Sequence, residues 1–247
     1  MIKINGNYAE AIIYSNEIDS GSEGLIKALC NCIIAEKSKI RVMPDAHPGK
    51  GCAVGMTMTL NERVAPGLVG VDIGCGMEVI KVKPKRLELQ QLDKVVQSKI
   101  PSGVKIRTAL HRFAEIESFS TIHNYIDVEN KILRKGAISA QEGEKIIVPL
   151  NMRDGCLICK GRGNEEYNYS APHGAGRLLS RADAKVAIDL EDYEKAMEGI
   201  YTTSVNYSTI DESPFAYKPI ESILDNIQDT VEVVKIIKPV YNYKCCD

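Results

Sequence analysis

Residues 170–181, SAPHGAGRLLSR, place a single imidazole directly before a turn of small residues. His173 is followed by residues suited to an anion site: Gly174, Ala175, Gly176 and Arg177, the last of which is predicted to open a helix running through residue 185. Backbone amides of small residues, a helix N-terminus and a guanidinium fork all favour phosphate. The pattern predicts an anion site with a nucleophile-capable histidine at its mouth. The alternative is a loop that caps a helix, with His173 as a surface side chain.

Asp72 and Cys75 form a second candidate site, within a glycine-rich apolar run at 67–83. We expect this run to be buried, and a buried carboxylate must be paired, hydrogen-bonded or bound to a cation. Glycines permit positive φ, so the two side chains can converge on one point. A carboxylate with a thiolate suits manganese or zinc. The alternative is that Asp72 caps backbone amides while Cys75 packs in the core.

Other polar residues allow both chemical and structural interpretations. Asp45 and His47 lie in the predicted loop 44–51, where they either build a site or form a solvated turn. His123 lies on a predicted helix, where a structural role is the more common one. Cys156 and Cys159 have the spacing of a zinc or redox pair, but no second pair accompanies them, which favours two strand thiols.

Elements of both kinds must position these residues. Apolar periodicity and turn residues predict helices at 24–37, 86–98, 118–135, 191–197 and 220–228 and strands at 11–15, 39–43, 52–60 and 145–150, followed by a strand-rich end at 230–244. No repeat or convincing linker interrupts the chain, so we expect one domain over residues 1–247.

Composition restricts the class of protein. The chain has 247 residues, 44% of them hydrophobic, which suffices for a core. A net charge of −2 and a pI near 6.1 argue against non-specific nucleic-acid affinity, so an RNA site must be a local basic patch. No apolar run has the length of a membrane span, and the first residues lack a signal-peptide pattern. We expect a cytoplasmic protein without a membrane partner, with most cysteines reduced. The sequence does not predict the oligomeric state.

A series of fragments, in order, resembles the RtcB family of RNA ligases: PDAHPGKG, GVDIGCGM, TIHNYID, KGRGN, NYSAPHGAGRLLSR, DESPFAYKP and KPVYNYK. The resemblance implies an α+β fold with mixed sheets around a metal and nucleotide cleft and helices outside. It also implies a reaction in which a histidine attacks the α-phosphate of GTP with the help of Mn²⁺. GMP then passes to an RNA 3′-phosphate, and a 5′-hydroxyl seals the strand; a 2′,3′-cyclic phosphate is opened first.

The same resemblance assigns roles to individual residues. His173 matches the guanylylated nucleophile, and Asp72, Cys75 and His123 match metal ligands. Asp45 matches an acidic residue beside the site. The remaining matches are nucleotide contacts: Asn124, Asn151, Met152, Gly174, Ala175, Gly176, Arg177, Tyr217 and Lys244. Cys156 stands where the family pattern predicts a serine.

One departure separates this chain from the family pattern. Family members carry a long segment with two metal-binding histidines and a nucleotide-contacting asparagine, whereas here Glu117 runs directly into Ser118. The chain has only four histidines, of which His111 lies nearest the junction and is a candidate replacement ligand. Three hypotheses follow: a compact ligase with one metal ion, a binding paralogue for GTP, metal and RNA ends that lacks full ligase activity, or a deletion product that keeps only the fold.

Overall fold

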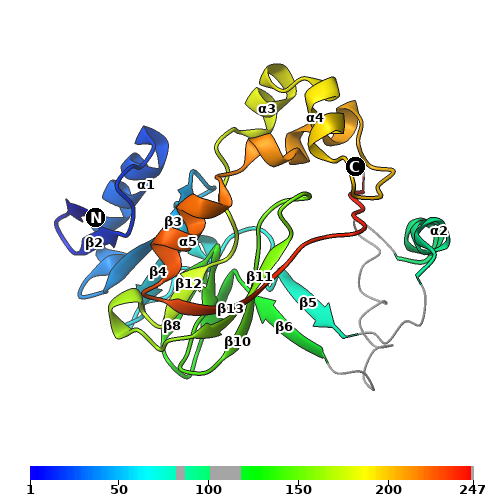
Figure 1. The fold of residues 1–247 in the computed structure, drawn as a ribbon. Helices are drawn as coiled ribbons and strands as arrows, with labels where there is room; N and C mark the ends of the chain where they lie inside the picture. Colours follow the sequence, from blue (N-terminus) through cyan, green and yellow to red (C-terminus); the bar gives the residue numbers. More distant parts are fainter. Residues whose placement is uncertain (82–86, 101–117, 246–247) are drawn as a thin grey trace.

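The computed structural model describes residues 1–81, 87–100 and 118–245. Its largest sheet has six strands in the order β1 (Ile2–Asn5), β2 (Glu10–Ile13), β3 (Ile40–His47), β4 (Val54–Thr59), β8 (Ile132–Lys135) and β7 (Tyr125–Asp127). β2 and β3 pair in parallel, and the other neighbours pair antiparallel. Helix α1 (Ser20–Cys30) connects the parallel pair and lies near the N-terminus in Figure 1. This sheet carries the end of β3 toward the candidate site.

Three smaller sheets complete the strands. They comprise β10 (Lys145–Pro149), β11 (Cys156–Gly161) and β13 (Val231–Ile237); β9 (Ala137–Ser139) with β12 (Ser170–Pro172); and β5 (Gly76–Ile80) with β6 (Ser118–Ile122). The other α-helices are α2 (Leu89–Lys99), α3 (Arg181–Ala187), α4 (Leu190–Ala196) and α5 (Ile220–Ile227). Figure 1 shows α3 and α4 grouped together, away from the sheets. The mixed sheets and surrounding helices confirm the predicted α+β class. No helix in the described ranges is long and apolar enough to cross a membrane.

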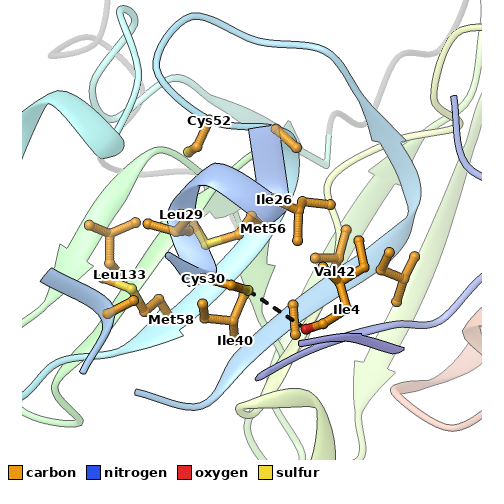
Figure 2. Close-up of a cluster of buried hydrophobic side chains, with 14 of the residues drawn as sticks. Ile4, Ile26, Leu29, Cys30, Ile40, Val42, Cys52, Met56, Met58 and Leu133 are labelled. Carbon is orange, nitrogen blue, oxygen red and sulfur yellow. Dashed lines mark hydrogen bonds between the residues drawn. The ribbon is translucent and has the colours of Figure 1, made fainter. Parts of the chain in front are cut away.

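The main core lies where α1 packs on the large sheet (Figure 2). Ile26 and Leu29 of α1 are buried against Met56 and Met58 of β4. Each such side chain contributes about 1.5–3 kcal/mol through burial. A second core packs the inner face of α5 against β10 and β11. Ala175, in the segment that follows β12, packs into this second core.

Two helix predictions need correction. α1 begins four residues before the predicted start because Asp19 caps it, accepting a hydrogen bond from the Ser22 amide at 2.8 Å. The predicted helix at 118–135 is wrong: this stretch forms β6, β7 and β8. The apolar spacing there also fits strands, and Asn124 at φ 56° turns the chain between β6 and β7. β8 is buried on both faces, so its consecutive apolar residues reflect burial within a sheet and do not mark one face of a helix.

The helix predicted to open at Arg177 begins later. α3 starts at Arg181, capped by Ser180, whose side chain accepts from the Asp183 amide. Arg177 instead forms an isolated antiparallel bridge with Tyr217. The small-residue turn after His173 therefore does not lead directly into a helix N-terminus. β3 also continues through Pro44 to His47, so half of the predicted loop is strand.

Candidate active site

Asp45 and His173 form a hydrogen-bonded pair at the centre of the candidate site. Asp45 lies near the end of β3, and His173 directly follows β12. The Nδ1 atom of His173 lies 2.8 Å from the Oδ2 atom of Asp45, whose side chain is fully buried. A carboxylate accepts, so it holds the imidazole proton on Nδ1 and leaves Nε2 with a free lone pair. The His173 side chain keeps 21% of its surface exposed, so a substrate can reach it.

Two glycines allow the backbone to close around this pair. Gly176 has φ +72°, and a Cβ there would lie 2.9 Å from the Cα atom of Asp45. Gly136 has φ +58°, and a Cβ there would lie 2.0 Å from the Cγ1 atom of Val54 and 2.9 Å from the Gly55 amide nitrogen, with the Cε1 atom of His173 at 3.3 Å. Glycine alone combines this backbone conformation with so close an approach. The small size of Gly176 therefore allows the loop after His173 to pack closely against β3, in addition to leaving room for a ligand.

A pocket of about 590 Å³ opens beside His173. It is lined by segments that lie far apart in the sequence: the β10–β11 turn, the residues after β12, the segment near Tyr217 and the C-terminal stretch. We call it the nucleotide pocket. It brings together most of the residues predicted to contact a nucleotide: Asn151, Met152, Gly174, Ala175, Gly176, Arg177, Tyr217 and Lys244. Cys156 also lines it, on the opposite face of β11 from the buried Cys159.

Two of these residues make other contacts with their side chains. The Asn151 side chain closes its own turn, accepting from the amides of Arg153 and Asp154 at 3.0 and 2.8 Å. Met152 is buried, and its sulfur accepts a hydrogen bond from the Tyr193 hydroxyl at 3.0 Å. Both side chains therefore shape the turn that forms one wall of the pocket.

Glu212 is a central residue of this pocket that the sequence analysis missed. Its Oε2 accepts from the Tyr217 hydroxyl at 2.7 Å and from Nζ of Lys244 at 3.0 Å, while its Oε1 pairs with Arg181 at 2.6 Å. Burial opposes ionisation, but the charge of Lys244 and the hydrogen bond from Tyr217 outweigh it and lower the pKa of Glu212 to about 2. The guanidinium of Arg177 lies 4.9 Å from the centre of the Tyr217 ring. The signal was present in DESPFAYKP, but only folding places its acid among these cations.

The three predicted metal ligands lie on two adjoining segments. The His123 amide donates to the Cys75 carbonyl at 2.8 Å, and the Asn124 side chain donates to the Asp72 carbonyl at 2.9 Å. The expectation that this run is buried is wrong: Asp72 is exposed and its neighbour Val71 is 82% exposed. The part of the run that precedes β5 turns across the surface although its residues are apolar. Hydrophobicity alone therefore did not predict burial here.

The charges around these ligands are coupled. Burial, a hydrogen bond with Asp72 and the negative charge of Asp72 raise the pKa of the Cys75 thiol to about 11. Burial and the nearby imidazole of His173 lower the pKa of His123 to about 4. The centres of the His123 and His173 rings are 4.6 Å apart. His123 is therefore a neutral imidazole at neutral pH, the form that binds metals.

The donor types suit a borderline divalent ion, since they comprise a carboxylate, a thiol and a neutral imidazole. Within the described residues, however, no three His, Cys, Asp or Glu side chains are gathered closely enough to form a metal-binding group. Binding one ion through Asp72, Cys75 and His123 would require their side chains to converge. His111 and the junction at Glu117 lie outside the described residues.

His47 and Asn124 line different pockets beside His173. The His47 ring centre is 6.3 Å from that of His173, and its Nδ1 atom lies 3.0 Å from the Asp45 carbonyl oxygen. His47 lines the nucleotide pocket. Asn124, although predicted to contact the nucleotide, lines a second pocket of about 180 Å³, which shares only His173 with the first.

Comparison with known proteins matches the sequence of this chain to one family. The family model described as tRNA-splicing ligase RtcB matches residues 30–120 and 107–245. An RNA-splicing ligase RtcB from Escherichia coli K12 is 36% identical over 131 residues, which cover 51% of this chain and 32% of the relative. A tRNA-splicing ligase RtcB from Aeropyrum pernix is 32% identical over 134 residues, 46% of this chain and 27% of the relative. The similar part of the chain thus spans less than a third of the length of each of these relatives.

Proposed function

This chain belongs to the RtcB family, and from that premise we propose that it is a GTP-dependent RNA ligase that joins 3′-phosphate or 2′,3′-cyclic phosphate ends to 5′-hydroxyl ends. The observation that carries the proposal is the hydrogen bond from His173 to the buried Asp45, beside a pocket that collects the expected nucleotide contacts. A histidine held in this way offers a fixed nucleophile to a bound phosphate. The named relatives are RNA or tRNA-splicing ligases.

In the proposed first step, Nε2 of His173 attacks the α-phosphorus of GTP. A P–N bond forms, the bond from the α-phosphorus to the bridging oxygen breaks, and pyrophosphate leaves. The imidazole becomes cationic in this step, and the Asp45 carboxylate, already bonded to Nδ1 at 2.8 Å, stabilises that charge. An oxygen of the RNA 3′-phosphate then displaces His173 from phosphorus. Finally, the 5′-hydroxyl attacks the activated end, losing its proton, and GMP leaves.

The nucleotide pocket supplies recognition in this proposal. The loop from Gly174 to Arg177 lines the pocket and is the segment proposed to meet the phosphates. Its Ala175 amide donates to the Pro149 carbonyl at 3.1 Å, and the Arg177 guanidinium donates to the Leu179 and Asp211 carbonyls and to the Tyr217 hydroxyl. Tyr217 offers an aromatic surface to the base, and Lys244 offers a donor to guanine, as the family resemblance implies. Glu212 positions Tyr217 and Lys244 through its two hydrogen bonds.

Asp72, Cys75 and His123 are the residues proposed to hold Mn²⁺. A bound divalent ion would neutralise phosphate charge and act as a Lewis acid. The substrate partners proposed are GTP and RNA ends, and the cytoplasm is the compartment proposed. Six of the described cysteines are free thiols, namely Cys30, Cys32, Cys52, Cys75, Cys156 and Cys159, which is compatible with a reducing environment.

The test is formation of the covalent intermediate. Purified protein is incubated with manganese and α-labelled GTP, denatured and digested, and the peptide carrying His173 is examined by mass spectrometry for added GMP. The parent protein should carry GMP on His173, and a His173→Ala variant with an unchanged melting temperature should carry none.

Label at another residue, or label that survives in the His173→Ala variant, would overturn the proposed mechanism. An intact parent that binds GTP and manganese but forms no adduct would support the alternative of a binding paralogue without full ligase activity.

A further inference from the structure

The C-terminal stretch, residues 238–245, follows β13 and forms part of the wall of the nucleotide pocket. Lys244, the proposed guanine contact, lies in this stretch and lines the pocket. Its amide donates to the Oγ atom of Ser204 at 2.9 Å. The Asn242 amide donates to the carbonyl of Tyr201 at 3.0 Å. The position of Lys244 therefore depends on how firmly the C-terminal stretch is joined to the segment that supplies these two acceptors.

Asp93 of α2 makes hydrogen bonds to both segments at once. Its Oδ1 atom accepts from the hydroxyl of Tyr241, in the C-terminal stretch, at 2.9 Å. The same atom accepts from the hydroxyl of Thr203, in the neighbouring segment, also at 2.9 Å. Burial and the hydrogen bond with Asp93 raise the pKa of Tyr241 to about 12, so this hydroxyl keeps its proton at neutral pH. One carboxylate thus joins the two segments that hold Lys244.

The helix that carries Asp93 buries little else. α2 is described in full, and Asp93 is its only buried residue, with 4% of its surface exposed. A helix that docks through an apolar face buries a stripe of side chains, whereas Val95 of α2 is 52% exposed. Figure 1 shows α2 apart from the sheets. Because a buried carboxylate needs hydrogen bonds or an opposite charge, the contacts of Asp93 with Tyr241 and Thr203 also fix the place of α2.

We propose that Asp93 is a positioning residue for nucleotide binding, which anchors α2 on the C-terminal stretch and so holds Lys244 in the nucleotide pocket. Asp93 is not among the described residues that line this pocket, so it acts on a nucleotide through Lys244. Without the carboxylate, the stretch spends less time in the position that binds the base, and the apparent affinity falls with that fraction. The effect on GTP rests on the proposed function, whereas the anchoring of the C-terminal stretch does not.

Hydrogen exchange tests the anchoring without nucleotide. Asp93→Asn removes the charge, and Tyr241→Phe removes the hydroxyl but keeps the ring. In both variants the amides of Asn242 and Lys244 should exchange about tenfold faster than in the parent, because a hydrogen bond of the buried carboxylate is lost. The amides of β10 and β11 should exchange at the parental rate. Tyr207→Phe removes the hydroxyl of a residue that is 74% exposed and should leave all of these rates unchanged.

Single-turnover formation of the His173 adduct tests the effect on the nucleotide. Asp93→Asn should raise the GTP concentration that half-saturates the rate by about tenfold and leave the maximal rate within about twofold of the parent value. Lys244→Gln should also raise this concentration. Adding Asp93→Asn to Lys244→Gln should raise it no further, because Asp93 acts through Lys244; two independent effects would add.

Parental exchange rates in folded Asp93→Asn protein overturn the anchoring. Faster exchange with a parental half-saturating GTP concentration, or an effect that adds to that of Lys244→Gln, overturns the positioning role. If Asp93→Asn does not fold, Tyr241→Phe decides both measurements. If the parent forms no His173 adduct, calorimetric binding of GTP replaces the rate. A parent that binds no GTP refutes the proposed function and the role in nucleotide binding, while faster exchange in the variants still supports the anchoring.

Discussion

Substituting Asp45 by Asn tests whether the buried carboxylate positions His173 for attack. The Oδ2 atom of Asp45 accepts from His173 at 2.8 Å, while Oδ1 is buried without a hydrogen-bond partner among the described residues. Asparagine has nearly the same shape, so the change removes charge and one acceptor with little change in packing. Loss of a charge-assisted hydrogen bond costs about 1.5–3 kcal/mol, which corresponds to a rate about 10 to 150 times lower if it is lost in the transition state.

The two orientations of the new amide each impair the nucleophile. If the amide oxygen points toward His173, the amide nitrogen takes the buried position of Asp45 Oδ1, which has no hydrogen-bond partner among the described residues. Burying this unsatisfied donor costs about 1–3 kcal/mol. With its nitrogen toward His173, the amide donates to Nδ1 and moves the ring proton to Nε2, which removes the attacking lone pair. We therefore expect Asp45→Asn to slow guanylylation by about 100-fold.

The assay is single-turnover formation of the His173 adduct at saturating GTP and manganese. Asp45 does not line the nucleotide pocket, so the concentration of GTP that half-saturates the rate should stay within about twofold of the parent value while the maximal rate falls. Asp225→Asn changes an exposed carboxylate on α5 and should leave both quantities unchanged. A parental maximal rate in a folded Asp45→Asn variant would refute the positioning argument.

Three further perturbations address the surroundings of the pair. Because the pKa of Glu212 is lowered to about 2, ionised Glu212 stabilises the fold above pH 4.5, and this stabilisation is lost as pH falls toward 2. In urea melts at a series of pH values, Glu212→Gln should make the free energy of unfolding less dependent on pH between 4.5 and 2. It should also remove the partner of Lys244. The pKa of His123 is lowered to about 4, so between pH 6.5 and 4 the unfolded chain binds a proton that the folded protein does not. The free energy of unfolding should therefore decrease as pH falls from 6.5 to 4. His123→Gln should show a smaller decrease over this range, and an equal decrease would contradict the assignment. Gly176→Ala should lower the free energy of unfolding by at least about 1 kcal/mol more than Gly199→Ala. Both glycines have positive φ, but of the two only Gly176 has backbone atoms within 3 Å of the added Cβ. Equal chemical-denaturation midpoints for the two variants would show that the protein relieves this close approach.

The sequence predicted His173 as the nucleophile, but it did not predict how the groups around His173 are held. His173 stands in a distinctive glycine-rich stretch, and family resemblance added Asp45 although 128 positions separate the two. Physical reasoning from the sequence alone left Asp45 equally consistent with a solvated turn. Its burial depends on β3 continuing through Pro44 and on Gly176 packing against it, both of which are tertiary facts.

Two errors have a common physical origin. Residues 118–135 and residues 67–83 are both rich in apolar side chains, yet the first forms strands rather than a helix and the second runs partly exposed across the surface. Apolar spacing over short stretches does not separate strand from helix, and hydrophobicity does not by itself indicate burial. Glu212 was missed for a related reason, because its cationic partners come from α3 and the C-terminal stretch.

The late start of α3 changes how the nucleotide pocket attracts an anion. A helix beginning at Arg177 would have directed its positive end at the loop after His173, but the first turn of α3 lies four residues further on, where Ser180 caps it. Attraction for a phosphate must then come from loop amides and from side-chain cations. Two of these cations, Arg181 and Lys244, already bind Glu212 at 2.6 and 3.0 Å. In the proposed function, a nucleotide phosphate that enters the pocket would compete with Glu212 for these two cations, which Glu212 holds in place.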